Sequence, residues 1–228
     1  MPTQQQLGLY WPNPPPTPSP VYLDLSHMQT TPAFPLRLTF KLLAIAPQFY
    51  LHDASGASLA YVRQKLFKFK EAVTVFADEQ QTKVRYKIQA DRVIDFSAQY
   101  NFTDAQGAGL GWVKQRGLRS LWKAGFDILD DGRLLFHINE KSVLTRFLDT
   151  LLGQIPVIGV LSGYLFQPAY IVSRPDGEEV MVLTKQPALF EGRFSIELAA
   201  NSGPLSARQT DQLLLSLMML VMLERNRA

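Results

Sequence analysis

The residue types that most often carry catalysis or bind metals are sparse in this 228-residue chain. It contains no cysteine, so thiol chemistry and disulfides are excluded. His27, His52 and His137 stand far apart and follow no metal-ligand spacing, so we interpret each as a surface or half-buried side chain. The acidic stretch DILDDG at 127–132 lacks the ligand spacing and closing Glu of a calcium loop. We therefore expect no metal site.

Motifs for nucleophilic catalysis or phosphate binding are also missing. The chain has no G-x-S-x-G elbow, no G-x-x-x-x-G-K-[ST] loop and no G-x-G-x-x-G following a strand. The glycines of GAGLG at 107–111 fit a turn, and acidic pairs such as Asp130-Asp131 fit solvated turns. We predict a non-enzymatic protein without a cofactor.

Cations beside aromatic side chains are the most distinctive functional signal. Residues 41–123 carry 13 Lys/Arg against 7 Asp/Glu, whereas the whole chain has a formal charge of only +3. Two segments, KLFKFK at 65–70 and VKQRGLRSLWK at 113–123, place cations next to Phe or Trp. The candidate binding residues are Arg63, Lys65, Lys68, Lys70, Lys114, Arg116, Arg119, Trp122 and Lys123.

Three interpretations of this basic, aromatic pattern remain open. It suits an anionic membrane surface, where each cation contributes about 1 kcal/mol near the headgroups and Trp favours the interface. It also suits single-stranded nucleic acid, whose bases stack on aromatics. The third interpretation is the ordinary polar face of an antiparallel sheet. We favour lipid over nucleic acid as a partner.

A repeated sequence segment indicates which structural elements hold these basic residues in place. DASGASLAYVRQK at 53–65 and DAQGAGLGWVKQR at 104–116 share seven of thirteen positions. Asp-x-x-Gly predicts a turn, because Asp bonds its own backbone and Gly accepts positive φ, and the following residues alternate as in a strand. Weaker echoes occur at Asp131-Gly132 and at Pro175-Asp176-Gly177. We interpret the repeat as duplicated sheet architecture, with a pair of equivalent ligand loops as the alternative.

The rest of the chain from Leu36 onward reads as short strands followed by one helix. Runs rich in Val, Ile, Tyr and Phe alternate with period two and are separated by Gly or Asp. Ser206 and Gln209 fit a capping box for a helix over 206–226, in which Ser216 is the only polar residue from Leu213 to Leu223.

An all-apolar helix must be surrounded on every side. These apolar positions span roughly 16 Å, about half of a bilayer core, so a protein host is favoured over lipid. We predict a closed antiparallel barrel of about twelve strands, residues 36–228, threaded by this helix.

Two further segments have an interpretation and an alternative each. Nine of the 15 prolines lie within residues 1–35, so this arm is expected to be extended or disordered, with a PxxP ligand for a protein partner as the alternative. Residues 148–172 are apolar but interrupted by Gly, Pro and Asp, which predicts a short helix and buried loop rather than a membrane hairpin.

The order of these motifs resembles the LURP-one-related and phospholipid-scramblase families of the tubby-like superfamily. The resemblance rests on the two hairpins, on YIVSRPDGEEVMVLTK, on GRFSIEL and on the apolar C-terminal helix. It implies a twelve-stranded barrel around a hydrophobic helix and, by likeness to tubby proteins, phosphoinositide binding through surface cations. The scramblase branch's cysteine-rich run and acidic calcium segment are absent, which argues against calcium-triggered scrambling.

We therefore predict a cytoplasmic barrel, peripheral at the membrane, that binds anionic phospholipid or phosphoinositide headgroups. The alternative is a structural scaffold whose proline-rich arm recruits a protein partner.

Overall fold

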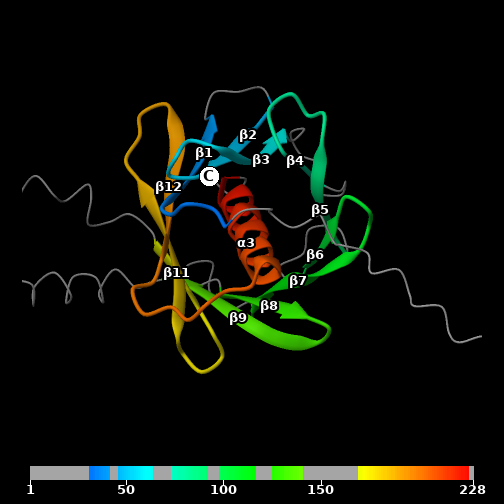
Figure 1. Cartoon of the computed structure of the whole chain (residues 1–228), viewed down its shortest axis with the longest axis vertical. Coiled ribbons are helices and arrows are strands. Elements are labelled where there is room, and N and C mark those ends of the chain that lie inside the picture. The colour runs from blue at the N-terminus through cyan, green and yellow to red at the C-terminus, as the bar shows by residue number, and fades with distance from the viewer. Residues whose placement is uncertain are drawn as a thin grey trace, which may run out of the picture.

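Twelve strands and one long helix make up the described part of the computed structural model (Figure 1). It describes residues 31–41, 46–63, 73–91, 98–116, 125–140 and 169–225. The proline-rich residues 1–30 and most of the apolar 148–172 stretch lie outside these ranges. The elements are β1 (Leu36–Lys41), β2 (Gln48–His52), β3 (Ser58–Arg63), β4 (Val73–Phe76), β5 (Val84–Ala90), β6 (Gln99–Asp104), β7 (Gly109–Arg116), β8 (Gly125–Asp130), β9 (Arg133–Glu140), β10 (Ala169–Ser173), β11 (Glu179–Gln186), β12 (Glu191–Leu198) and α3 (Ala207–Arg225).

The strands form one closed antiparallel barrel, which confirms the predicted fold class. Each strand pairs with its neighbours in the chain, and β1 closes the ring on β12, with Leu38 opposite Phe194. Closure leaves no free sheet edge. As predicted, short strands make up the described chain from Leu36 to Leu198, and one helix follows them. β2 was not singled out by the sequence pattern, because its five residues provide only Phe49 and Leu51 as buried positions.

The helix α3 begins as its capping box predicted. The Ser206 backbone N–H donates to Gln209 Oε1 at 3.0 Å, and the Gln209 N–H donates to Ser206 Oγ at 3.1 Å. These reciprocal bonds satisfy backbone donors that the first turn leaves without a partner. Ser216, the single polar residue of the apolar run, donates a hydrogen bond from its hydroxyl to the Gln212 carbonyl at 2.7 Å. It therefore requires no partner from the barrel.

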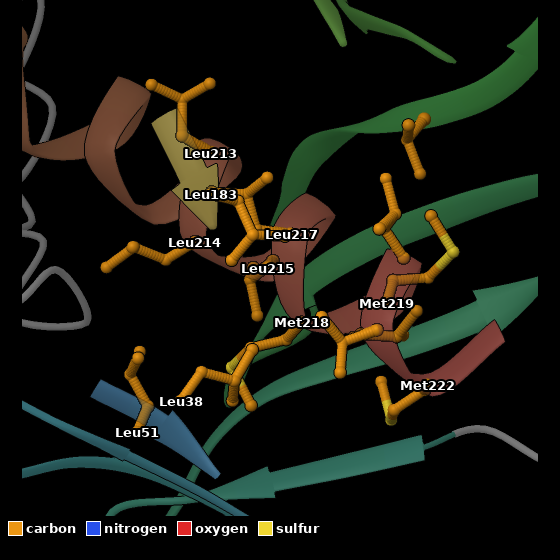
Figure 2. Close-up of a cluster of buried hydrophobic side chains, with 14 of the residues drawn as sticks. Leu38, Leu51, Leu183, Leu213, Leu214, Leu215, Leu217, Met218, Met219 and Met222 are labelled. Atoms are coloured by element: carbon orange, nitrogen blue, oxygen red, sulfur yellow. The ribbon is translucent and has the colours of Figure 1, made fainter. Parts of the chain in front are cut away.

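The barrel interior is filled by α3. Every helix residue from Thr210 to Leu223 is buried. Figure 2 shows Leu and Met side chains of the helix packed near Leu38, Leu51 and Leu183, which come from β1, β2 and β11. The inward faces of the strands supply the rest of the same core, as in β1, where Leu36, Leu38 and Phe40 alternate with exposed or half-buried residues. The sheet is thus the host that an apolar helix requires.

The sequence repeat is an architectural repeat with three copies. Hairpins β2–β3, β6–β7 and β10–β11 follow one another at intervals of four strands around the twelve-stranded ring. Their turns, 53–57, 104–108 and 174–178, close with the same bond from the first N–H to the fifth carbonyl, at 3.0, 3.0 and 2.8 Å. The fourth residue is a glycine with φ of +88°, +90° and +95° respectively. The weak echo at Pro175-Asp176-Gly177 is therefore an equivalent hairpin, whereas Asp131-Gly132 is a two-residue turn between the paired Asp130 and Arg133 and is not a further copy.

In the first two copies the Asp carboxylate of the turn accepts hydrogen bonds from backbone N–H groups. Asp53 Oδ1 accepts the Ser55 and Ala57 N–H groups, and Asp104 Oδ1 does the same for Gln106 and Ala108. The Ser55 hydroxyl and these backbone donors lower the pKa of Asp53. Since these oxygens already have local partners, the geometry favours duplicated architecture over paired ligand loops.

The antiparallel path gives the barrel two distinct rims. The entry rim holds the start of α3 and the turns 53–57, 104–108, 131–132 and 174–178. The exit rim holds the end of α3 at Arg225, the strand ends at Lys41, Arg63, Arg116 and Glu140, and the connection between β11 and β12. Figure 1 shows the helix running from one rim to the other through the ring of strands.

Replacing Met219 with Asp should unfold the domain. Met219 is 1% exposed at the centre of the barrel. A buried carboxyl without a partner costs at least several kcal/mol even after it neutralises, against a typical domain stability of about 5–15 kcal/mol. We expect insoluble protein, or loss of the cooperative thermal transition by circular dichroism, whereas Met219→Leu should stay folded. Cooperative folding of residues 36–204 alone would contradict the threaded barrel.

Adding one methyl group at Gly192 should destabilise the barrel. A Cβ at this position of β12 would overlap the ring of Phe40, which packs in the core. Overpacking of this kind costs about 1–3 kcal/mol. Gly109 of β7 has open space around the same position, so Gly109→Ala is the matched control. Urea denaturation of both alanine variants should show a lower midpoint for Gly192→Ala only; equal midpoints would refute the close packing.

Candidate functional site

Three of the nine predicted binding residues lie in described strands, and all three are near the exit rim. Arg63 is the last residue of β3, while Lys114 and Arg116 lie at the end of β7. The other six, Lys65, Lys68, Lys70, Arg119, Trp122 and Lys123, lie outside the described residues. Strands β3 and β7 are four positions apart around the ring. The described cations therefore share a rim without forming one contiguous patch.

Arg116 is engaged by protein partners. Its Nε lies 2.9 Å from Asp127 Oδ1, and its Nη2 donates to Asn139 Oδ1 at 2.5 Å. The guanidinium passes over Gly125, where any Cβ would come within 2.8 Å of Nη2. Arg116 and Lys114 are both exposed, but Arg116 is already half of an ion pair between β7 and β8, which makes it the weaker candidate for binding a ligand.

A His–Asp pair completes this cluster on the outer face of β7, β8 and β9. His137 Nδ1 lies 2.7 Å from Asp127 Oδ1, and both side chains are 23% exposed. His137 was predicted to be a surface or half-buried side chain and is half-buried, but the sequence did not reveal its partner. A simple two-residue turn at Asp131-Gly132 would pair Asp127 with Phe136. A bulge between Ile128 and Leu129 shifts the register by one and brings His137 opposite Asp127.

The two rims carry opposite net charge in the described part of the chain. At the exit rim seven cations face five acids: Lys41, Arg63, Lys114, Arg116, Lys185, Arg193 and Arg225 against Asp91, Asp127, Glu140, Glu191 and Glu224. At the entry rim six cations face eleven acids: Arg37, Lys83, Arg85, Arg133, Arg174 and Arg208 against Asp53, Asp78, Glu79, Asp104, Asp130, Asp131, Asp176, Glu178, Glu179, Glu197 and Asp211. Lys87 lies midway along β5. The barrel therefore has an electrostatic polarity along the helix axis.

Burial raises the pKa of two ionisable groups, Tyr50 at the middle of β2 and Glu140 at the exit rim. Desolvation raises the pKa of Tyr50 to about 12, and the acceptor Glu79 at 3.0 Å adds to this effect. Desolvation also raises the pKa of Glu140, with a contribution from the nearby carboxylate Glu224. Glu224 in turn lies 3.7 Å from Lys185 Nζ. No group of three His, Cys, Asp or Glu side chains within the described ranges could hold a metal ion.

The entry rim anchors α3 through one half-buried carboxylate. Asp130, at the end of β8, accepts Arg208 Nε at 2.8 Å and Nη2 at 3.0 Å, and it accepts Gln212 Nε2 at 2.9 Å. The same amide donates to the Leu110 carbonyl at 3.0 Å. The bonds from Arg208 lower the pKa of Asp130. This cluster ties the first turns of the helix to β7 and β8.

The helix fills the barrel interior, where every residue from Thr210 to Leu223 is buried. Among the described residues, no helix combines the length and apolar composition that crossing a bilayer requires. A ligand of the described part would therefore be bound from the outside, at a rim or on the outer face of the sheet.

Comparison with known proteins supports one part of the sequence resemblance. A family model described as LURP-one-related matches residues 59–154, from β3 to beyond β9. The match covers less than half of the 228 residues. No curated protein and no solved structure matches the chain. The similarity to LURP-one-related proteins is thus found independently, whereas the scramblase and tubby relationships have no support from these comparisons.

Removing the charge of Asp130 should make the fold less stable at neutral pH. A hydrogen-bonded ion pair of this kind, partly exposed at Arg208, contributes about 1–2 kcal/mol. Because the pKa of Asp130 is lowered in the folded state, this contribution is complete above the ordinary carboxyl pKa and is lost as the pH falls through the folded value. Asp130→Asn should therefore lower the urea midpoint at pH 7, and the difference from wild type should shrink in acid.

The neighbouring Asp131 supplies the control for this measurement. It is exposed in the turn with φ of +47°, a conformation that Asn also accepts. Asp131→Asn should leave the midpoint almost unchanged at both pH values. Equal effects of the two variants would mean that Asp130 does not anchor α3.

Proposed function

We propose that this protein is a non-enzymatic barrel that binds anionic phospholipid or phosphoinositide headgroups, with the exit rim turned toward the membrane. The observation that carries the proposal is the charge polarity of the described barrel, with an excess of acids at the entry rim and of cations at the exit rim. An anionic surface attracts one end of such a molecule and repels the other. The proposed location is the cytoplasm, peripheral at the membrane.

The sequence adds cations that follow the same strands. Lys65, Lys68 and Lys70 come directly after β3, and Arg119 and Lys123 come soon after β7. Both strands end at the exit rim. The helix occupies the barrel interior, so recognition of a charged surface from outside suits this architecture better than enclosure of a small substrate. The proposed relationship to tubby-like proteins agrees with this mode of binding.

Reversing two exposed cations of the exit rim should weaken binding to anionic vesicles. At about 1 kcal/mol per cation, losing Arg63 and Lys114 corresponds to roughly a 30-fold loss of affinity, and reversal to Glu should exceed this. Co-sedimentation with phosphatidylcholine vesicles, with and without phosphatidylserine or a phosphoinositide, measures the effect. Binding should weaken as salt increases, because headgroup attraction is screened.

The entry rim offers a control with the same change of charge. Lys83 and Arg133 are exposed, like Arg63 and Lys114, but lie at the opposite end of the barrel. Lys83→Glu with Arg133→Glu should bind almost as well as wild type. Equal loss in both double variants would indicate a response to net charge alone. Failure of the wild type to bind either vesicle would reject lipid binding and favour the alternative, a scaffold whose PNPPPTPSP arm recruits a protein partner.

A further inference from the structure

The connection between β11 and β12 displays two large apolar side chains to solvent. Leu189 is 87% exposed and Phe190 is 75% exposed, whereas Leu198 and Leu134, the other large exposed hydrophobics of the described chain, are 43% and 36% exposed. The last paired residues below the loop are Gln186 and Arg193. The loop in Figure 1 reaches past the sheet at the exit rim, near the end of α3.

Packing does not explain this pair. Both side chains lie outside the core cluster of the barrel and its partly buried neighbours. Scattered single hydrophobics are normal on a protein surface, but two adjacent ones at the end of a loop keep apolar area in water without contributing to the fold.

Cations surround the base of this apolar loop. Lys185 and Arg193 flank it on β11 and β12, Lys41 ends β1 opposite Glu191, and Arg225 ends α3 with its guanidinium 5.7 Å from the Phe40 ring. Two neighbouring acids each lie close to one of these cations: Glu191 pairs with Arg193, and Glu224 lies 3.7 Å from Lys185. With Glu140, which lies near Glu224, four cations and three acids leave a small excess of positive charge. The loop is thus apolar at its end and basic at its base.

We propose that Leu189 and Phe190 insert into the bilayer, at the boundary between headgroups and acyl chains, when the exit rim docks on anionic lipid. This inference rests on the proposed lipid binding. The loop has apolar side chains at its end and cations at its base. A membrane leaflet has the matching order, because the acyl chains lie deeper than the phosphate groups. A protein interface of ordinary size buries about 800 Å² per partner, which two projecting side chains do not supply. Insertion into a membrane requires no such area, because the two side chains alone can enter the bilayer.

The absence of cysteine makes the depth of the loop measurable. Leu189→Cys introduces the sole thiol of the chain, and Leu198→Cys does so at the entry rim. Each variant is labelled with an environment-sensitive fluorophore such as nitrobenzoxadiazole and mixed with phosphatidylcholine–phosphatidylserine vesicles. We expect a blue shift and rising intensity at position 189 and no change at 198. Equal spectra with and without vesicles at position 189, under conditions where the protein sediments with them, would overturn insertion.

A second pair of variants tests the contribution to affinity. Leu189→Ser with Phe190→Ser should reduce binding to the same vesicles roughly tenfold or more, because two large side chains no longer leave water. This loss should persist at moderate salt, unlike the effect of charge reversal. Leu134→Ser with Leu198→Ser, on exposed residues of the entry rim, is the matched control.

The outcomes separate the two proposals. Wild type that binds anionic vesicles, together with a serine variant that binds equally well, would overturn insertion and leave headgroup binding intact. Wild type that binds no vesicle would reject both.

Discussion

The structure depends on enclosing one apolar helix. Every residue of α3 from Thr210 to Leu223 is buried, so the helix has no face that water could cover. A closed sheet provides contacts on all sides and, at the same time, removes the free strand edges that an open sheet would expose. The helix is accordingly the centre of the core, and the barrel and helix must form together.

Because α3 fills the barrel interior, a ligand would have to bind to the outer surface of the barrel. The Asp130 cluster fixes the start of α3 at the entry rim, where acids are in excess, and Arg225 ends the helix at the rim with more cations. The antiparallel path decides which residues share a rim, since every second connection lies at the same end. Arg63 and Lys114 are therefore brought to one end of the molecule although 51 residues separate them.

Ion pairing decides which of the predicted cations are available to bind a ligand. Arg116 and Lys114 look alike in the sequence and both are exposed, but Arg116 contacts Asp127 and Asn139. Arg116 lies opposite Gly125, which leaves room for the guanidinium, and a bulge between β8 and β9 aligns His137 with Asp127. Neither a bulge nor a cross-strand contact is visible in the periodicity of a single strand, so this cluster could not be predicted.

The sequence by itself determined the period-two strands, the capped helix at 206–226, the repeated turns and the need for a closed host, because each follows from local propensity or from the balance of apolar and polar residues. Only the tertiary structure decided how the third hairpin completes a ring of equivalent copies, which cations are paired, and that Leu189 and Phe190 lie at the rim richer in cations. These features depend on strand register and closure, which join residues far apart in the chain and are set by packing around the helix.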